Sequence, residues 1–176
     1  LADLEAALAE ILSAFRPGKV ARIFSIFARR IDRILFAATK ADHLNRADHD
    51  RLEAILRRLV GRAIERAEYG GAEVDVLALA AIRATREASL THHGETMPAI
   101  LGTPLTGERV NGETYDGRTE IALFPGDLPD DPDVLFAADA PASSVRFVRF
   151  RPPELQVTAE GVKLSLPHIR LDRALQ

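Results

Sequence analysis

The stretch RILFAATKAD, residues 33–42, decides the fold that the sequence predicts. Its first part, RILFAA, is apolar and short, which is typical of a strand buried on both faces of a parallel sheet. Residues 47–68 carry apolar side chains on one stripe with Arg and Glu opposite, which predicts a long helix. Residues 73–81, EVDVLALAA, indicate a second buried strand. Strand, helix and strand in this order predict a βαβ unit with parallel strands and a right-handed crossover.

The segments on either side of this unit have a different character. Residues 1–15 have helical spacing and are followed by Pro17-Gly18, which stops a helix. We interpret residues 19–30, KVARIFSIFARR, as a helix packed on the domain, with a membrane-surface helix as the alternative. The second half of the chain has short apolar runs, most of the prolines and glycines, and the hairpin signal Asn111-Gly112. We therefore expect an antiparallel β appendage that ends in the start of a helix, HIRLDRALQ.

Length and composition narrow the class of protein. The chain has 176 residues, a formal net charge of −3 and no cysteine, which fits one domain without disulfides or thiolate metal sites. No apolar run approaches the roughly 18 residues of a membrane span. The chain begins without Met and within a helical pattern, so we expect a part of a longer protein. We expect a cytoplasmic location, with peripheral attachment at the inner membrane as the alternative.

The residues after the first strand, Thr39 to Asp42, suit a ligand site. In open α/β sheets, ligands bind beyond the carboxyl ends of the strands. Asp42 can accept two parallel hydrogen bonds there, and guanine offers the matching pair of ring N1–H and exocyclic N2–H₂, which adenine lacks. The aliphatic stem of Lys40 can lie along the purine face with its ammonium at the rim. In an extended K-x-D segment, Lys40 and Asp42 would point to the same side and meet one base.

A purine carbonyl also needs a hydrogen-bond donor. In this architecture the donor is a backbone N–H in the loop after the next strand. Here that loop contains Ala80, Ala81 and Ile82, and the alanines are small enough to let a base approach the backbone.

These residues carry a family resemblance. TKAD resembles the base-recognition motif [NT]-K-x-D of GTPases, and LAAI resembles their weaker S-A-K motif. Across the whole chain, segments such as HDRLEAILRRLVGRAIERAE, DVLALAAIRATREA, FPGDLP, VRFVRFRPP and LPHIRLDRALQ resemble the C-terminal part of the YcjX-like family. That is a bacterial family of GTPase-like P-loop NTPases associated with stress-induced operons. The resemblance implies a purine nucleotide, GTP or ATP, together with Mg²⁺ in the full-length parent.

Two positions depart from the GTPase pattern. Thr39 stands where most GTPases have Asn, so it offers only a hydroxyl to the phosphate loop, and Ala80 stands at the serine of S-A-K. The phosphate-loop motif G-x-x-x-x-G-K-[ST] has one near match, GTPLTGER at residues 102–109, where Glu108 occupies the lysine position and would repel phosphate. We interpret it as a loop between strands. We therefore expect no catalytic residue in this chain, which should be inactive alone.

Two other patterns have ordinary structural explanations. Residues 42–50, DHLNRADHD, and 91–93, THH, contain Asp and His, but the helical spacing of a metal site is absent, so we interpret Asn45 or Asp48 as a helix N-cap and expect no metal ligands. Residues 145–153, VRFVRFRPP, interleave Arg and Phe as single-stranded nucleic-acid sites do. We favour one half-buried strand and expect no nucleic-acid partner.

The sequence therefore predicts an α/β fold, the C-terminal half of a P-loop NTPase with an antiparallel β appendage. Residues 1–90 would form the base-binding part, and residues 91–176 a β-rich extension packed on it. The predicted site consists of Thr39, Lys40, Asp42, Ala80, Ala81 and Ile82. The alternative is a non-catalytic interaction module, in which the nucleotide site is vestigial and the chain contacts a membrane-associated protein partner in a stress response.

Overall fold

The structure is a computed structural model that describes residues 2–14, 31–92, 94–110, 112–137, 139–140, 145, 147–154, 156–158, 161–163 and 166–176. The chain divides into two compact units, and its trace passes between them several times. The first unit draws on the ranges Leu1–Ala37, Arg51–Leu77 and Pro129–Pro141. The second draws on Ala38–Asp50, Ala78–Leu128 and Ala142–Gln176. The functional division that we expected at residue 90 stays a prediction.

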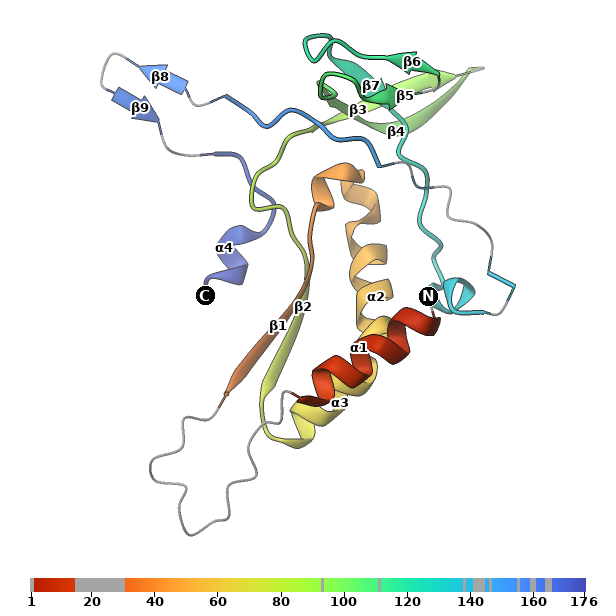
Figure 1. Cartoon of the computed structure of the whole chain (residues 1–176), viewed down its shortest axis with the longest axis vertical. Coiled ribbons are helices and arrows are strands. Elements are labelled where there is room, and N and C mark those ends of the chain that lie inside the picture. The colour runs from red at the N-terminus through yellow and green to blue at the C-terminus, as the bar shows by residue number, and fades with distance from the viewer. Residues whose placement is uncertain are drawn as a thin grey trace. The chain divides into compact units, whose positions relative to one another are not determined.

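The first part of the chain, where the structure describes it, forms three α-helices and a pair of strands (Figure 1). The elements up to the second strand are α1 (Ala2–Ala14), β1 (Arg33–Ala38), η1 (Ala41–His43), η2 (Arg46–Asp48), α2 (His49–Leu59), α3 (Gly61–Tyr69) and β2 (Glu73–Ala78). The rest are β3 (Arg86–His92), β4 (Glu95–Gly102), β5 (Arg109–Val110), β6 (Glu113–Thr114), β7 (Ile121–Leu123), η3 (Pro132–Leu135), β8 (Gln156–Thr158), β9 (Gly161–Lys163) and α4 (Leu171–Ala174).

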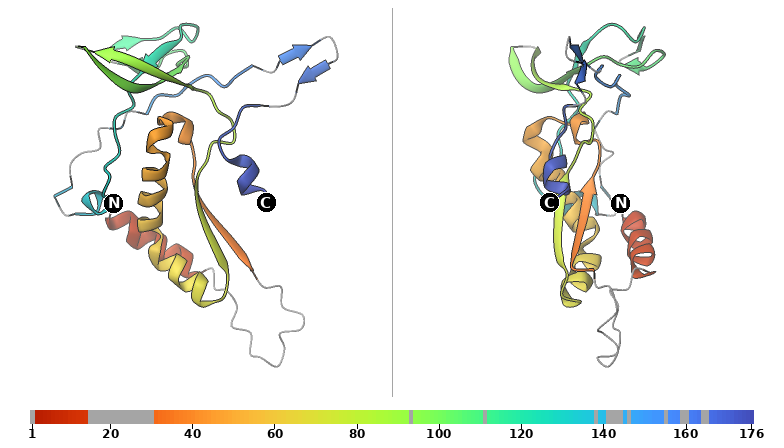
Figure 2. Two further views of the ribbon diagram at one scale, coloured as in Figure 1. Left: turned by 180° about the vertical axis from the view of Figure 1, so that it is seen from behind. Right: turned by 90° about the vertical axis from the view of Figure 1, so that its left-hand side faces the viewer.

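β1 and β2 form a parallel pair, as the sequence predicts. The Glu73 amide donates to the Asp32 carbonyl at 2.8 Å, and the Leu79 amide donates to the Ala38 carbonyl at 2.9 Å. Both bonds join residues 41 apart in the sequence, and such a constant offset defines a parallel register. The strands lie side by side in both views of Figure 2. The strand–helix–strand prediction is thus confirmed.

The helix between these strands is broken, whereas the sequence pattern predicted one continuous helix. α2 ends at Leu59 and α3 begins at Gly61, because Val60 between them leaves helical geometry with φ −103° and ψ 13°. The apolar stripe nevertheless continues across the break and packs on the strands. The core of the first unit consists of Val60, Ile64 and Val76, with Leu8, Phe36, Leu56 and Val74 packed against them.

The prediction that both strands are buried on both faces is correct only for the second half of β2. Val76 and Leu77 are 3% and 0% exposed, whereas Leu35 in β1 is 39% exposed. Within the described residues β1 pairs with β2 alone, so its side chains have a neighbouring strand on one side. Ile34 and Phe36 are accordingly half-buried.

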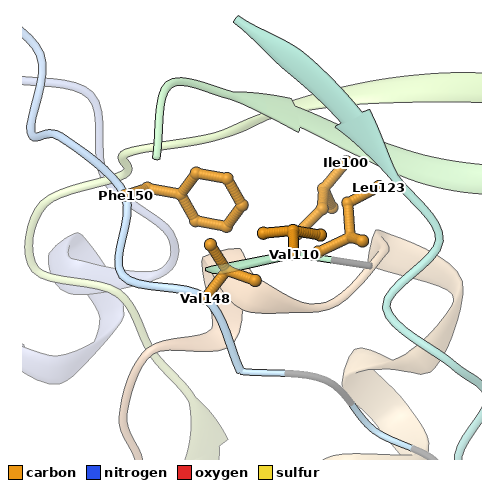
Figure 3. Packing of buried hydrophobic residues seen from close by; sticks show 5 residues of the cluster. All are labelled: Ile100, Val110, Leu123, Val148 and Phe150. Atoms are coloured by element: carbon orange, nitrogen blue, oxygen red, sulfur yellow. The ribbon is translucent and has the colours of Figure 1, made fainter. Parts of the chain in front are cut away.

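The second unit contains the antiparallel β structure that we expected. β3, β4 and β7 form a three-stranded antiparallel sheet in that order. β5 and β6 form the predicted hairpin, with Gly112 of its turn at φ 88°, and β8 pairs with β9 in the same way. The core of this unit, shown in Figure 3, consists of Ile100, Val110, Leu123, Val148 and Phe150.

Residues 147–151 run extended along the loop that follows β4. Leu105 donates its amide to the Arg149 carbonyl at 2.8 Å, and Arg151 donates to Thr103 at 2.7 Å. Phe147 is 73% exposed, whereas Val148 and Phe150 are 5% and 7% exposed. This alternation agrees with the half-buried face that we predicted for VRFVRFRPP, but among its described residues the segment makes one isolated antiparallel bridge, between Phe150 and Pro104, and no strand. The predicted helix start at the C-terminal end is confirmed as α4.

The interpretation of residues 19–30 lies outside the described residues. Among the helices that the structure does describe, none has the length and apolar character needed to span a bilayer.

Candidate nucleotide-base site

The predicted site residues lie in two loops of the second unit, at the carboxyl ends of β1 and β2. We call residues 39–45 the TKAD loop and residues 79–85 the post-β2 loop. The Ala41 amide donates to the Leu79 carbonyl at 3.0 Å, which joins the two loops directly beyond the last bond of the parallel pair. Thr39 and Lys40 are exposed, and residues 41–45 are buried.

The TKAD loop is not the extended segment that the sequence suggested. Lys40 has φ 62° and ψ 35°, a left-handed conformation, and Ala41–His43 form the 3-10 turn η1. Lys40 and Asp42 therefore do not alternate along a strand onto one side, because such alternation requires extended backbone. The sharp turn at Lys40 instead leaves this residue exposed, whereas Asp42 is 4% exposed and lies against the post-β2 loop.

Asp42 contacts the post-β2 loop with both its side chain and its backbone. Its Oδ2 accepts a hydrogen bond from the Ala84 amide at 2.9 Å, and its carbonyl accepts a short one from the Thr85 hydroxyl. Thr85 is itself only 2% exposed. These two contacts fix the position of Asp42 relative to the post-β2 loop. We expected a backbone N–H of this loop to donate to the carbonyl of the purine.

Some backbone amides of the post-β2 loop donate a hydrogen bond and others do not. Ala80 donates to the Ile169 carbonyl at 3.1 Å and accepts from its amide at 2.9 Å, and Arg83 donates to Pro167 at 2.7 Å. In the described structure, the amides of Ala81 and Ile82 have no acceptor, and both residues are exposed. Three residues were predicted to offer an N–H donor to a base. The N–H groups of Ala81 and Ile82 are available for this, whereas that of Ala80 is already bonded.

Two buried histidines follow Asp42. Burial lowers the pKa of His43, with a smaller opposing effect from the Asp42 carboxylate and a reinforcing one from Lys40. Burial also lowers the pKa of His49, although its hydrogen bond to the Ala41 carbonyl opposes the shift. Both rings are thus neutral near pH 7. His49 Nε2 lies 2.9 Å from that carbonyl, which can only accept, so Nε2 carries the proton.

Asn45 caps the turn that leads into α2. It is one of the two residues that the sequence offered as the helix N-cap. Its Oδ1 accepts from the Ala47 amide at 3.0 Å. Its Nδ2 donates to the Glu87 carboxylate at 2.7 Å and to the Ala99 carbonyl at 3.3 Å. The cap therefore also ties the TKAD loop to β3 and β4. Among the described residues no group of three or more acidic or histidine side chains is arranged to hold a metal ion.

The near match to a phosphate loop is a structural loop. Glu108, at the lysine position of that motif, accepts from the Arg149 backbone amide at 3.1 Å and from its Nε at 2.6 Å. These hydrogen bonds lower the pKa of Glu108 below its ordinary value, which keeps the side chain anionic. The interpretation as a loop between strands is confirmed by β4 before it and β5 after it.

Sequence reasoning missed Ala84, Thr85 and Phe150. Ala84 and Thr85 bond Asp42 from 42 and 43 residues away, and no local motif marks them. Phe150 reaches the ring of His43 with centroids 5.7 Å apart in an edge-on arrangement. Only a hydrophobic alternation around residue 150 was visible, and it indicated burial without naming a neighbour.

Comparison with known proteins relates the chain to one family. The sequence model described as the YcjX-like family, DUF463, matches residues 1–176. A Shewanella oneidensis protein named Ras-like GTPase YcjX is 31% identical over 175 residues, 99% of this chain and 33% of that protein. The protein of the same name from Escherichia coli K12 is 32% identical over 180 residues, 99% of this chain and 34% of that protein. The chain spans about a third of the length of these curated relatives.

Proposed function

The chain belongs to the YcjX-like family, and on this premise we propose that it is the guanine-binding portion of a longer GTPase-like P-loop protein. The observation that carries the proposal is the junction of the TKAD and post-β2 loops. Asp42 and the amides of Ala81 and Ile82, which have no acceptor among the described residues, belong to loops that are joined by the Ala41–Leu79 hydrogen bond at the carboxyl ends of two parallel strands. This is the edge of an α/β sheet where ligands bind.

Each residue has a distinct role in this proposal. Asp42 accepts from N1–H and N2–H₂ of guanine, and an amide of Ala81 or Ile82 donates to the O6 carbonyl. The exposed stem of Lys40 lies on the purine face. Thr39 offers its hydroxyl toward the phosphate side. Because the Ala84 amide already occupies Oδ2, the more available oxygen for the base is Oδ1, while Oδ2 keeps its second lone pair.

The full-length protein would hydrolyse the nucleotide with Mg²⁺. The sequence of this chain has no complete phosphate-loop motif, so phosphate and metal binding are assigned to the rest of the parent. In this proposal the chain selects the base and takes no part in the phosphoryl chemistry.

The test is base selectivity in the full-length protein. In Asp42→Asn the amide oxygen would stay on the Ala84 N–H, which only an acceptor can satisfy. The amide NH₂ would then face the base, donor against the donors of guanine, whereas xanthine presents a carbonyl there. Each charge-assisted bond contributes about 1.5–3 kcal/mol, so GTP affinity should fall about a hundredfold or more while XTP affinity rises.

Dissociation constants of GTP, XTP and ATP for wild type and Asp42→Asn decide the question. Asp50→Asn is the matched control, because its side chain is 88% exposed. An unchanged GTP affinity together with comparable ATP binding would contradict guanine recognition by Asp42. No binding of any of the three by wild type would instead favour the non-catalytic interaction module.

A further inference from the structure

The β-rich strands contact the TKAD loop through polar groups. Thr85, directly before β3, donates its hydroxyl to the Asp42 carbonyl. Asn45 reaches the Glu87 carboxylate in β3 at 2.7 Å and the Ala99 carbonyl in β4 at 3.3 Å. The loop is thus hydrogen-bonded to the residue before β3, to a side chain of β3 and to a backbone carbonyl of β4.

A second set of contacts comes from the extended segment at residues 147–150. The ring of His43 packs edge-on against Phe150, and its centroid lies 6.3 Å from that of Phe147. Phe150 is 7% exposed and belongs to the core cluster of Figure 3. His43, next in the chain to Asp42, is therefore seated on the hydrophobic core of the second unit. Its Nδ1 is buried without a hydrogen-bond partner in the described structure, so the ring is held by packing on that side.

We infer that Thr85 and Phe150 are positioning residues that set the orientation of Asp42 and, through it, the choice of base. The inference rests on the proposed function. Asp42 is fixed at its carbonyl by Thr85, at its carboxylate by Ala84, and through the following ring by Phe150. Removal of the Thr85 hydroxyl frees the carbonyl end, and the carboxylate then turns away from the geometry that two parallel bonds to guanine require.

The experiment measures the ratio of GTP to ATP affinity in the full-length protein. Thr85→Val keeps the side-chain shape and removes the donor, and Thr85→Ser keeps the donor. Thr91→Val, an exposed position in β3, is the control for the same chemical change. We expect Thr85→Val to lower the ratio about tenfold through weaker GTP binding with ATP unchanged. Thr85→Ser and Thr91→Val should keep the wild-type ratio.

A double variant separates positioning from general damage. If Thr85 acts through Asp42, Thr85→Val should not change the ratio further in an Asp42→Asn background. Phe150→Leu, which keeps an apolar side chain in the core, should lower the ratio several-fold and covers the case in which Thr85→Val does not fold. Parallel losses of GTP and ATP in these variants, or additive effects with Asp42→Asn, overturn the inference while guanine recognition stands. A wild type without guanine preference overturns the proposed function and this inference with it.

Discussion

Leu77→Ala tests the parallel strand pair that carries the candidate site. Leu77 in β2 is 0% exposed, so its truncation removes about three buried carbon groups at about 0.8 kcal/mol each and leaves a cavity. The free energy of unfolding should fall by about 3–4 kcal/mol. Leu35→Ala in β1 is the matched control, because the same change at a 39% exposed side chain loses less transfer energy and leaves a solvent-filled space. We expect about 1–1.5 kcal/mol there.

Urea titration followed by far-UV circular dichroism is the suitable assay, since the chain has no Trp and only two Tyr. With a denaturant slope of roughly 2 kcal/mol per molar, the urea midpoint should fall by about 1.5–2 M for Leu77→Ala and by less than about 1 M for Leu35→Ala. Slopes equal to wild type are required for this comparison. Equal midpoint shifts for the two variants would refute the assignment of β2 as the buried strand and β1 as the half-exposed one.

Two further predictions concern pH and backbone conformation. The pKa values of His43 and His49 are lowered in the folded state from 6.5. Because the unfolded chain binds protons more readily at these residues, the free energy of unfolding is highest above pH 6.5 and falls as the pH decreases below it. The slope of the unfolding free energy against pH is at most about 1.4 kcal/mol per pH unit per histidine. Urea midpoints measured between pH 7.5 and 5.5 should depend less on pH in a variant with both histidines replaced by Asn. A wild-type midpoint that rises on acidification would contradict this prediction. Gly117 and Gly107 have φ values of 78° and 85°, but a Cβ at Gly117 would lie 2.3 Å from the Thr106 hydroxyl oxygen, whereas nothing lies within 4 Å at Gly107. Gly107→Ala should therefore cost about 1 kcal/mol and Gly117→Ala at least twice that, and equal losses in thermal melts would show that the contact is unimportant.

The parallel pair could be predicted because two short apolar runs around an amphipathic segment leave few alternatives. The exposure of β1 could not be predicted, since the letters RILFAA indicate an apolar strand but not how many strands lie beside it. Asn45 was identifiable as a cap because capping depends on a local pattern. The break of the helix at Val60 was not identifiable from the sequence, because the apolar stripe continues through it.

The candidate site shows the same limit. TKAD and LAAI stand in the two loops that the Ala41–Leu79 hydrogen bond joins, and this junction follows from the order of the strands. The left-handed turn at Lys40 was not visible, because the same K-x-D letters fit extended and turned backbone. The contacts of Asp42 with Ala84 and Thr85 join residues more than 40 apart, so they depend on tertiary structure that spacing does not encode.

The left-handed conformation of Lys40 has an evolutionary consequence. A side chain with a Cβ costs about 1–2 kcal/mol in this region relative to glycine, and Asn tolerates it better than Lys does. Folding alone would therefore favour Gly or Asn at position 40, and drift without selection for a ligand should replace the lysine. Relatives that have lost nucleotide recognition should carry such replacements, while lineages that use the stem of Lys40 against a purine should retain it despite the strain. Under the proposed function, the residue at this single position should therefore distinguish lineages that use the site from lineages that do not.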